Sequence, residues 1–349
     1  MENKIRVGIA GATGYVGMEL VRILCNHPSF ALTRLISQSY IGKKFSEVYP
    51  AFRSIMDMEC VDLNVDDLAL NCDIVITALP HGVSAKLVPQ LLSKDLRVLD
   101  HSGDFRYRNV EVYEKAYKLK HPDPILSENA VYGLPEQYRE KIADAQLVAN
   151  PGCYPTCSIL GIKPLLTHDL IDIDSIIIDA TSGVSGAGRN QNPAFQFCEA
   201  ESNFKAYGVV GHRHTSEIEQ ELSILAGKDV AVSFTPHLAP MKRGMLATIY
   251  AKQKTRLSAQ DLHDLYTKEY KGELFVRILP LGMYPETKNV AYTNFIDISI
   301  FVDDHTGRVV VLSAIDNLGK GSALQGIQTL NCMYGIPENT GLTQIGGGL

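Results

Sequence analysis

One cysteine, Cys153, stands where its thiol could act as a nucleophile. It follows Pro151-Gly152 at the end of a short apolar run, and Pro155 with the apolar residues after it predicts the first turn of a helix. A thiol at a helix N-terminus faces unpaired backbone N–H groups and the positive end of the helix dipole, which favours the thiolate. The alternative is a buried cysteine that packs as a small apolar side chain, the more common role of an intracellular cysteine.

A histidine-rich string, Gly-His-Arg-His at residues 211–214, offers a partner for proton transfer. A capping-box pattern starts at Ser216, so we expect both histidines just ahead of a helix. An imidazole there can exchange protons near neutral pH, and with Cys153 it forms a possible Cys/His pair. His-x-His is also a metal-ligand spacing, but no third ligand is obvious nearby, so we predict no metal. A polar surface loop is the alternative.

A glycine loop, Gly8-x-x-Gly11-x-x-Gly14-x-x-Gly17, lies between an apolar strand pattern at 4–10 and a helical pattern. In this context glycines let a backbone approach a pyrophosphate at a helix N-terminus, so the loop predicts dinucleotide binding, with a tight turn as the alternative. The residues that we expect to contact the dinucleotide here are Gly11, Thr13, Gly14, Tyr15 and Val16.

The end of the second predicted strand, 30–36, favours NADP over NAD. NAD sites usually carry Asp or Glu at this position, which binds the ribose 2′-hydroxyl. Here Ser37, Ser39 and Lys43 follow the strand, with no carboxylate to repel a phosphate. The alternative is a solvated polar loop.

Three further strings have the composition of site loops. Residues 182–189 are rich in glycine and follow a predicted strand, so they could lie against a flat ring or a phosphate. The second string, 102–106, follows a parallel strand at its carboxyl end, and the third, 236–244, carries two cations. As residues that bind an anionic substrate we expect Arg106, Arg189 and Lys242, although a solvated surface role is equally consistent with the sequence.

The elements around these motifs predict an α/β protein with two domains. Short apolar strands at 4–10, 30–36, 73–79 and 97–100 alternate with helices, which indicates a Rossmann-type, doubly wound parallel sheet. After the helix at Cys153 the pattern changes to a largely antiparallel sheet with a few helices, an α+β domain. The strands that we expect in it are 175–180, 230–234, 245–251, 275–279, 295–302 and 308–315. A last helix, 321–333, could return to the first domain.

Composition excludes several classes of function. The chain has 349 residues, 45% of them hydrophobic, and a net charge of -6, with its cations scattered. We therefore expect no nucleic-acid partner, and no apolar stretch approaches the roughly 20 residues that cross a bilayer. Seven cysteines at irregular spacing and no signal-peptide pattern indicate a reducing cytoplasm without a disulfide framework.

Taken together, the motifs closely resemble the N-acetyl-gamma-glutamyl-phosphate reductases, a family of arginine-biosynthesis enzymes related to aspartate-semialdehyde dehydrogenase. The resemblance runs essentially end to end. The strings that carry it are residues 8–17, 78–82, 100–106, 132–136, 149–156, 182–189, 211–214 and 235–238. The cysteine and double-histidine strings are specific to this family, whereas the glycine loop is not. Gln38 departs from it, because members often carry Arg there.

The resemblance implies a reaction. The Cys153 thiolate would attack the acyl phosphate of N-acetyl-glutamyl 5-phosphate and form a thioester, which NADPH reduces to the semialdehyde. His214 would be the acid/base, with His212 in reserve. The residues that the family pattern places on the cofactor side are Pro80, Ser182, Ser185 and Asn317, and Gly186 of the same glycine-rich loop is expected there too.

The resemblance also implies an organisation. We expect an NADP-binding domain at 1–149, completed by 318–349, and a catalytic and oligomerisation domain at 150–317, in a homo-oligomer, either a dimer or a tetramer. Two alternatives stay open: a reductase of another acyl phosphate (carrier-bound amino-adipyl phosphate or aspartyl phosphate), and a non-catalytic NADP-binding sensor.

Overall fold

The structure, a computed structural model, describes residues 4–189 and 193–347. The chain divides into two compact units, which are described separately. The first comprises the chain up to Pro151 together with Ser322–Thr343. The second comprises Gly152–Gly321 and the chain from Gln344 onward.

The first unit is built on a seven-stranded parallel sheet with the order β3-β2-β1-β4-β5-β7-β6. Its strands are β1 (Ile5–Ala10), β2 (Phe30–Ile36), β3 (Cys60–Val61), β4 (Ile74–Thr77), β5 (Arg97–Asp100), β6 (Val131–Tyr132) and β7 (Leu147–Ala149). Its helices are α1 (Tyr15–Leu24), α2 (Phe45–Val48), α3 (Val65–Asn71), α4 (Ser84–Leu92), α5 (Val110–Tyr117), α6 (Pro124–Asn129), α7 (Pro135–Asp144) and α13 (Leu324–Met333). The predicted doubly wound parallel sheet is confirmed.

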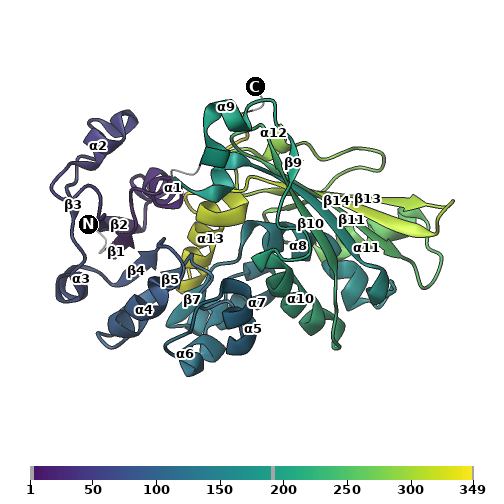
Figure 1. Cartoon of the computed structure of the whole chain (residues 1–349), viewed down its shortest axis with the longest axis horizontal. Coiled ribbons are helices and arrows are strands. Elements are labelled where there is room, and N and C mark those ends of the chain that lie inside the picture. Colours follow the sequence, from purple (N-terminus) through teal and green to yellow (C-terminus); the bar gives the residue numbers. More distant parts are fainter. Residues whose placement is uncertain (1–3, 190–192, 348–349) are drawn as a thin grey trace. The chain divides into compact units, whose positions relative to one another are not determined.

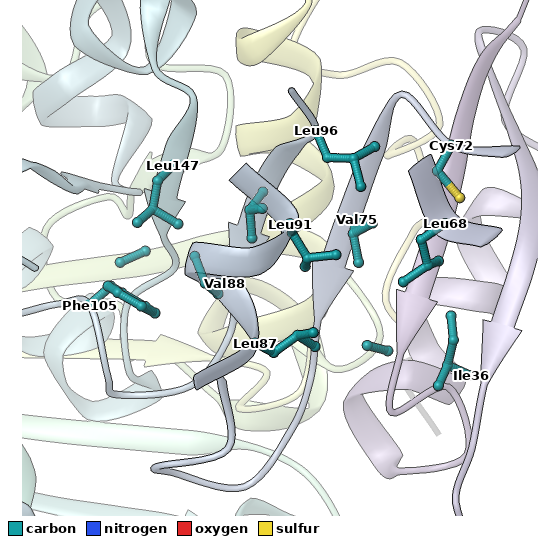
Figure 2. Close-up of a cluster of buried hydrophobic side chains, with 13 residues drawn as sticks. Ile36, Leu68, Cys72, Val75, Leu87, Val88, Leu91, Leu96, Phe105 and Leu147 are labelled. Atoms are coloured by element: carbon teal, nitrogen blue, oxygen red, sulfur yellow. The ribbon is translucent and has the colours of Figure 1, made fainter. Parts of the chain in front are cut away.

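Helices α3 and α4 cover the sheet through a shared apolar core. Figure 2 shows Leu87 and Leu91 of α4 beside Val75 of β4, with Leu68 of α3 in the same cluster. The strands are apolar on both faces because helices cover both faces of such a sheet. Packing therefore fixes the carboxyl ends of β1, β4 and β5, where the predicted site loops begin.

Helix α13 belongs to the first unit although it comes from the far end of the chain. It packs on α7 and α1, and its side chains Gln325 and Thr329 both donate hydrogen bonds to the Gly133 carbonyl. A π-helical turn, Gly319–Ala323, leads into it, so the α-helix begins three residues later than expected.

The second unit holds another seven-stranded sheet, with the order β12-β13-β14-β11-β8-β10-β9. Its strands are β8 (Ile177–Gly183), β9 (Lys205–Ala206), β10 (Ser233–Ala239), β11 (Met245–Lys252), β12 (Val276–Ile278), β13 (Ile296–Asp303) and β14 (Arg308–Ile315). Its helices are α8 (Cys153–Thr167), α9 (Phe197–Ala200), α10 (Arg213–Ala226), α11 (Ala259–Glu269) and α12 (Thr287–Val290). The pairs β8–β10 and β12–β13 are parallel and the other pairs are antiparallel, so the sheet is largely antiparallel, as predicted.

One face of the second sheet is covered by helices. Helix α8 packs on β11 and β14, α11 packs on β13, and α10 packs on α8; the long strands β11, β13 and β14 lie side by side in Figure 1. Buried and half-buried residues alternate along β11, with Ile249 buried and its neighbour Tyr250 half-buried. This alternation is the pattern of a sheet with one covered face.

Strands β8 and β10 begin and end later than predicted. Strand β8 continues through Ser182 and Gly183, which we expected in a loop, because β10 and β11 flank it on both sides. A Cβ at Gly183 would lie 2.9 Å from the Lys242 carbonyl oxygen, so this glycine permits a close backbone approach. Strand β10 likewise continues to Ala239 through Pro236, whose carbonyl accepts a hydrogen bond from the Tyr207 N–H.

Candidate functional site

Cys153 is the first residue of α8, so its backbone lies at the N-terminus of a buried helix. The N-cap is Gly152, whose carbonyl accepts the Thr156 N–H at 3.0 Å. Twelve of the fifteen residues of α8 are buried, so burial against the sheet fixes the helix, and the thiol-bearing residue at its start is only partly buried. Cys157, one turn on, is fully buried, and burial raises its pKa to about 12. The two cysteines therefore differ in the exposure a nucleophile needs.

Helix α10 begins earlier than the capping-box pattern predicted. It starts at Arg213, and His212 is the N-cap, with its imidazole Nδ1 accepting the His214 N–H at 3.1 Å. The predicted start at Ser216 is wrong because an imidazole, which is not among the usual capping side chains, takes the capping role. His214 therefore lies within the first helical turn, where backbone hydrogen bonds hold it.

His214 packs directly on the residue before the cysteine. A Cβ at Gly152 would lie 2.6 Å from Nε2 of His214, so the imidazole occupies the space that only glycine leaves. Three residues further along α10, the buried Glu217 accepts the Gly152 N–H through Oε1 at 2.9 Å. Residues three apart share a helix face, so α10 directs an imidazole and a carboxylate at the turn that precedes Cys153.

Aromatic rings surround the two histidines. The ring centroids of His212 and His214 are 4.9 Å apart, and Tyr154, Tyr207 and Phe234 lie within 5.6 Å of His212. Burial, with a smaller contribution from the Arg213 charge, lowers the pKa of His212 to about 4. His212 is therefore neutral at neutral pH, as its capping role requires. Burial also raises the pKa of Tyr154, whose hydroxyl accepts a hydrogen bond from Tyr207 at 3.1 Å.

A cavity of about 330 Å³ in the second unit brings these groups together. Its lining residues are Cys153, Tyr154, Ser182, Gly183, Gly186, Ala187, Ala194, Phe195, Lys205, Tyr207, His212, Arg213, His214 and Leu238. Five of them were predicted from the sequence as site residues: Cys153, His212, His214, Ser182 and Gly186.

Four polar residues of this cavity were not assigned from the sequence: Tyr154, Lys205, Tyr207 and Arg213. Lys205 lies in the two-residue strand β9, which is too short to have a periodic signal, and Tyr207 follows it. Arg213 could have been found, because it separates the two histidines that drew attention to the string.

Ser185 and Asn317 form a hydrogen bond with each other and are not among the residues that line the cavity. The Asn317 amide donates to the Ser185 hydroxyl at 2.9 Å, and its carbonyl oxygen accepts the Gly244 N–H at 2.8 Å. Lys242 and Arg189 are both exposed and are not among the described residues that line the cavity. Their predicted roles in substrate binding remain predictions.

In the first unit, the glycine loop has the geometry of a phosphate cradle. Gly11 has a φ of +91°, and a Cβ there would lie 2.3 Å from the Ala78 carbonyl oxygen. Gly14 is the N-cap of α1, and a Cβ on it would be 3.5 Å from its nearest neighbour, the Gly11 oxygen. The space above Gly14 is thus open at a helix N-terminus, which suits a pyrophosphate.

The end of β2 suits a phosphorylated ribose. The hydroxyls of Thr13 and Ser37 lie 2.7 Å apart, so the glycine loop and the strand end meet there. Ser39 and Lys43 are exposed beyond them. Two hydroxyls and a cation are groups that bind a 2′-phosphate, so the residues present fit NADP.

Pro80 and Arg106 lie in the loops after β4 and β5. Pro80 is exposed, whereas the Arg106 guanidinium is buried and donates to the carbonyls of Asn150, at 2.8 Å, and His101, at 3.0 Å. Part of the Arg106 donor capacity therefore stabilises the loop after β5.

Other kinds of function would require a metal-binding cluster or a membrane-spanning helix among residues 4–189 and 193–347. Within these ranges, no three His, Cys, Asp or Glu side chains are grouped so that they could hold a metal ion. No helix there has both the length and the apolar character needed to span a membrane.

Comparisons with known proteins match both units. A family model described as "Semialdehyde dehydrogenase, NAD binding domain" matches residues 6–145, and one described as "Semialdehyde dehydrogenase, dimerisation domain" matches residues 153–317. A protein of Acetivibrio thermocellus named N-acetyl-gamma-glutamyl-phosphate reductase is 56% identical over 97% of this chain and 98% of its own. A protein of the same name from Campylobacter jejuni subsp. doylei is 48% identical over 97% of this chain and 98% of its own.

Solved structures share the fold at lower identity. Aspartate semialdehyde dehydrogenase II of Vibrio cholerae matches with a TM-score of 0.72 and 17% identity, covering 95% of this chain and 98% of that one. Aspartate semialdehyde dehydrogenase of Candida albicans, solved with NADP, matches with a TM-score of 0.69 and 16% identity, over 95% and 98%.

Proposed function

Because this chain belongs to the N-acetyl-gamma-glutamyl-phosphate reductases of the semialdehyde dehydrogenase family, we propose that it reduces N-acetyl-L-glutamyl 5-phosphate to N-acetyl-L-glutamate 5-semialdehyde through a thioester on Cys153. One observation carries the proposal. The partly buried cysteine at the start of α8 shares a cavity with His214, whose ring packs on the adjacent Gly152.

Cys153 performs the first step. Its thiolate attacks the acyl carbon, the bond from that carbon to the phosphate oxygen breaks, and inorganic phosphate leaves with the electron pair. The N-terminus of α8 favours the thiolate over the thiol. The thioester holds the carbonyl in one orientation in the cavity, which a freely diffusing acyl phosphate does not provide.

His214 is the acid/base group in this proposal. It accepts the thiol proton before attack and donates this proton to the tetrahedral thiohemiacetal oxygen as that oxygen develops charge. It then takes the proton back while the carbonyl re-forms and the bond to the Cys153 sulfur breaks, which releases the semialdehyde and regenerates the thiolate. His212 is less suited, because its Nδ1 caps α10 and its pKa is lowered to about 4, so at neutral pH it is not an imidazolium that could act as the acid. We therefore assign proton transfer to His214 and a structural role to His212.

NADPH supplies, when bound, the hydride that reduces the thioester carbon. The residues that would hold it are Gly11, Thr13, Gly14, Tyr15 and Val16 at the pyrophosphate and Ser37, Ser39 and Lys43 at the 2′-phosphate. Pro80, Ser182, Ser185, Gly186 and Asn317 would lie toward its nicotinamide. Asn317 holds the Ser185 hydroxyl, and the Gly244 N–H fixes the Asn317 amide in turn.

We propose that the first unit is the NADP-binding domain and the second the catalytic and oligomerisation domain of a cytoplasmic homo-oligomer. The sheet face opposite α8 supports self-association, because Ile177, Tyr250 and Val310 lie in one row of paired strands and are all at least partly exposed. Apolar side chains in such a row are suited to contact a second copy.

Replacing the nucleophile tests the mechanism. In Cys153→Ala we expect hydride transfer to fall at least about a thousandfold, because no thioester can form. We expect NADPH to bind as in the wild type, measured by fluorescence titration, since none of the proposed cofactor contacts is altered.

Turnover retained by Cys153→Ala would overturn the covalent mechanism. A side-by-side assay with aspartyl phosphate and carrier-bound amino-adipyl phosphate tests the substrate, and faster reduction of either of these would overturn that assignment. NADPH binding without reduction of any of the three would indicate a cofactor sensor.

A further inference from the structure

The cavity at Cys153 carries a positive charge that the proposed mechanism does not use. Its described lining contains no Asp or Glu, and His212 is neutral, so Lys205 and Arg213 supply its fixed charge. A substrate with a carboxylate at one end and an acyl phosphate at the other brings anionic charge to both ends. A cavity with two cations matches such a substrate electrostatically.

Lys205 is held at a defined position on the same sheet. It pairs with Leu238 of β10, and Leu238 in turn pairs with Ser182 of β8. Directly paired residues project from the same face of a sheet, so all three side chains line one wall of the cavity. With strands about 4.8 Å apart, the backbone of Lys205 lies about 10 Å from that of Ser182.

The ammonium of Lys205 is available to a ligand. The side chain is half-buried, and within the described part of the chain its Nζ has no hydrogen-bond or ion-pair partner. Half-burial reduces the solvent screening of its charge, which strengthens an ion pair with an incoming anion.

The spacing of the two anionic groups in the substrate determines which of them can bind Lys205. The phosphate is attached to the carbon that Cys153 attacks, so it must lie next to Cys153 and His214. The α-carboxylate is separated from that carbon by three further carbons, so its partner must lie farther along the cavity. Arg213 directly precedes His214, whereas Lys205 comes from the edge strand β9.

We infer that Lys205 is the specificity-determining residue that binds the α-carboxylate of the N-acetylglutamyl chain. This inference rests on the proposed function, because it places the acyl chain in the cavity of Cys153. The apolar Leu238 lies between Lys205 and Ser182 along the wall and would contact the methylene carbons of the chain.

The reverse reaction allows the binding of the two anionic groups to be measured separately. The semialdehyde, which carries the α-carboxylate, and inorganic phosphate are then two different substrates, added together with NADP. In Lys205→Met we expect the KM for N-acetylglutamate semialdehyde to rise about tenfold or more, because the variant loses one charge-assisted hydrogen bond to the carboxylate. The KM for phosphate should stay within about twofold of the wild type. Lys205→Arg, which keeps the cation, should restore most of the semialdehyde affinity.

A substrate without the carboxylate provides a second measurement. 4-Acetamidobutanal lacks only that group, so we expect Lys205→Met and the wild type to oxidise it with the same kcat/KM. The matched control is Lys252→Met, an exposed lysine at the end of β11, which should behave as the wild type with both aldehydes. Thermal unfolding of each variant verifies that it is folded.

Three results would overturn the inference: a rise in the phosphate KM alone, no change in the semialdehyde KM, or an equal loss with 4-acetamidobutanal. Each variant retains Cys153, and Cys153→Ala is assayed in parallel. Activity without the thiol would count against the thioester mechanism, whereas the KM pattern alone decides the role of Lys205.

Discussion

At the scale of single residues, the site depends on the absence of a side chain at Gly152. The His214 ring fills the space where a Cβ would stand, and the Gly152 N–H is taken by the buried Glu217. The position of the acid/base group is therefore set by the backbone next to the nucleophile. Small displacements of such a pair are costly to catalysis, because proton transfer requires hydrogen-bond geometry.

Gly152→Ala tests this arrangement. The new methyl group would lie 2.6 Å from Nε2 of His214, so the ring must move, and we expect kcat to fall by about tenfold to a hundredfold. The matched control is Gly211→Ala, since a Cβ there meets no atom within 4 Å and its φ is not positive. Steady-state kinetics with both variants measure the difference. Equal activity of the two would show that His214 does not depend on the space at Gly152.

At the scale of elements, the start of α10 depends on the protonation state of His212. Its folded-state pKa of about 4 lies below the ordinary value of 6.5, so between these values the unfolded chain binds the proton more strongly. The contribution of His212 to stability is thus fully present above pH 6.5 and is lost as the pH falls towards 4.

His212→Asn removes the titration while supplying another capping side chain. We expect the free energy of unfolding of the wild type, relative to this variant, to fall by about 1–3 kcal/mol between pH 7 and pH 4. Urea unfolding across that range measures it. Ser93→Asn, a change at an exposed side chain that does not titrate, should give a constant difference from the wild type. If the difference in the free energy of unfolding between the wild type and His212→Asn is also constant across this range, the stability of α10 does not depend on the protonation state of His212.

The elements also explain how far the sequence could predict the structure. Apolar runs and helical periodicity were sufficient for strands β1, β2, β4 and β5 of the parallel sheet and for the helix at Cys153, but not for the two-residue strands β3 and β6. They failed at the ends of β8 and β10, because Gly183 and Pro236 usually mark the end of a strand, and here neighbouring strands on both sides keep them in the sheet. Lys205 was missed because its importance follows from the lateral pairing of β9, β10 and β8, which a linear pattern does not contain.

At the scale of the whole molecule, the two units carry different parts of the chemistry. The first holds the glycine loop and the residues suited to NADP, and the second holds the cysteine, the histidines and their cavity. The family and the reaction class inferred from the motifs are confirmed by the relatives and the family models, and a model of an NAD-binding domain matches the first unit. The individual site residues stay predictions, because a match to a family does not assign a role to each side chain.

The most direct test of the account is to trap the thioester. The protein is mixed with N-acetyl-glutamyl 5-phosphate without NADPH, quenched in acid, and analysed by intact-mass and peptide mass spectrometry. We predict one N-acetylglutamyl group per chain, on Cys153, that disappears when NADPH is added before the quench and never forms in Cys153→Ala. An unmodified Cys153 under conditions in which NADPH is otherwise consumed, or acylation of another residue, would contradict the mechanism.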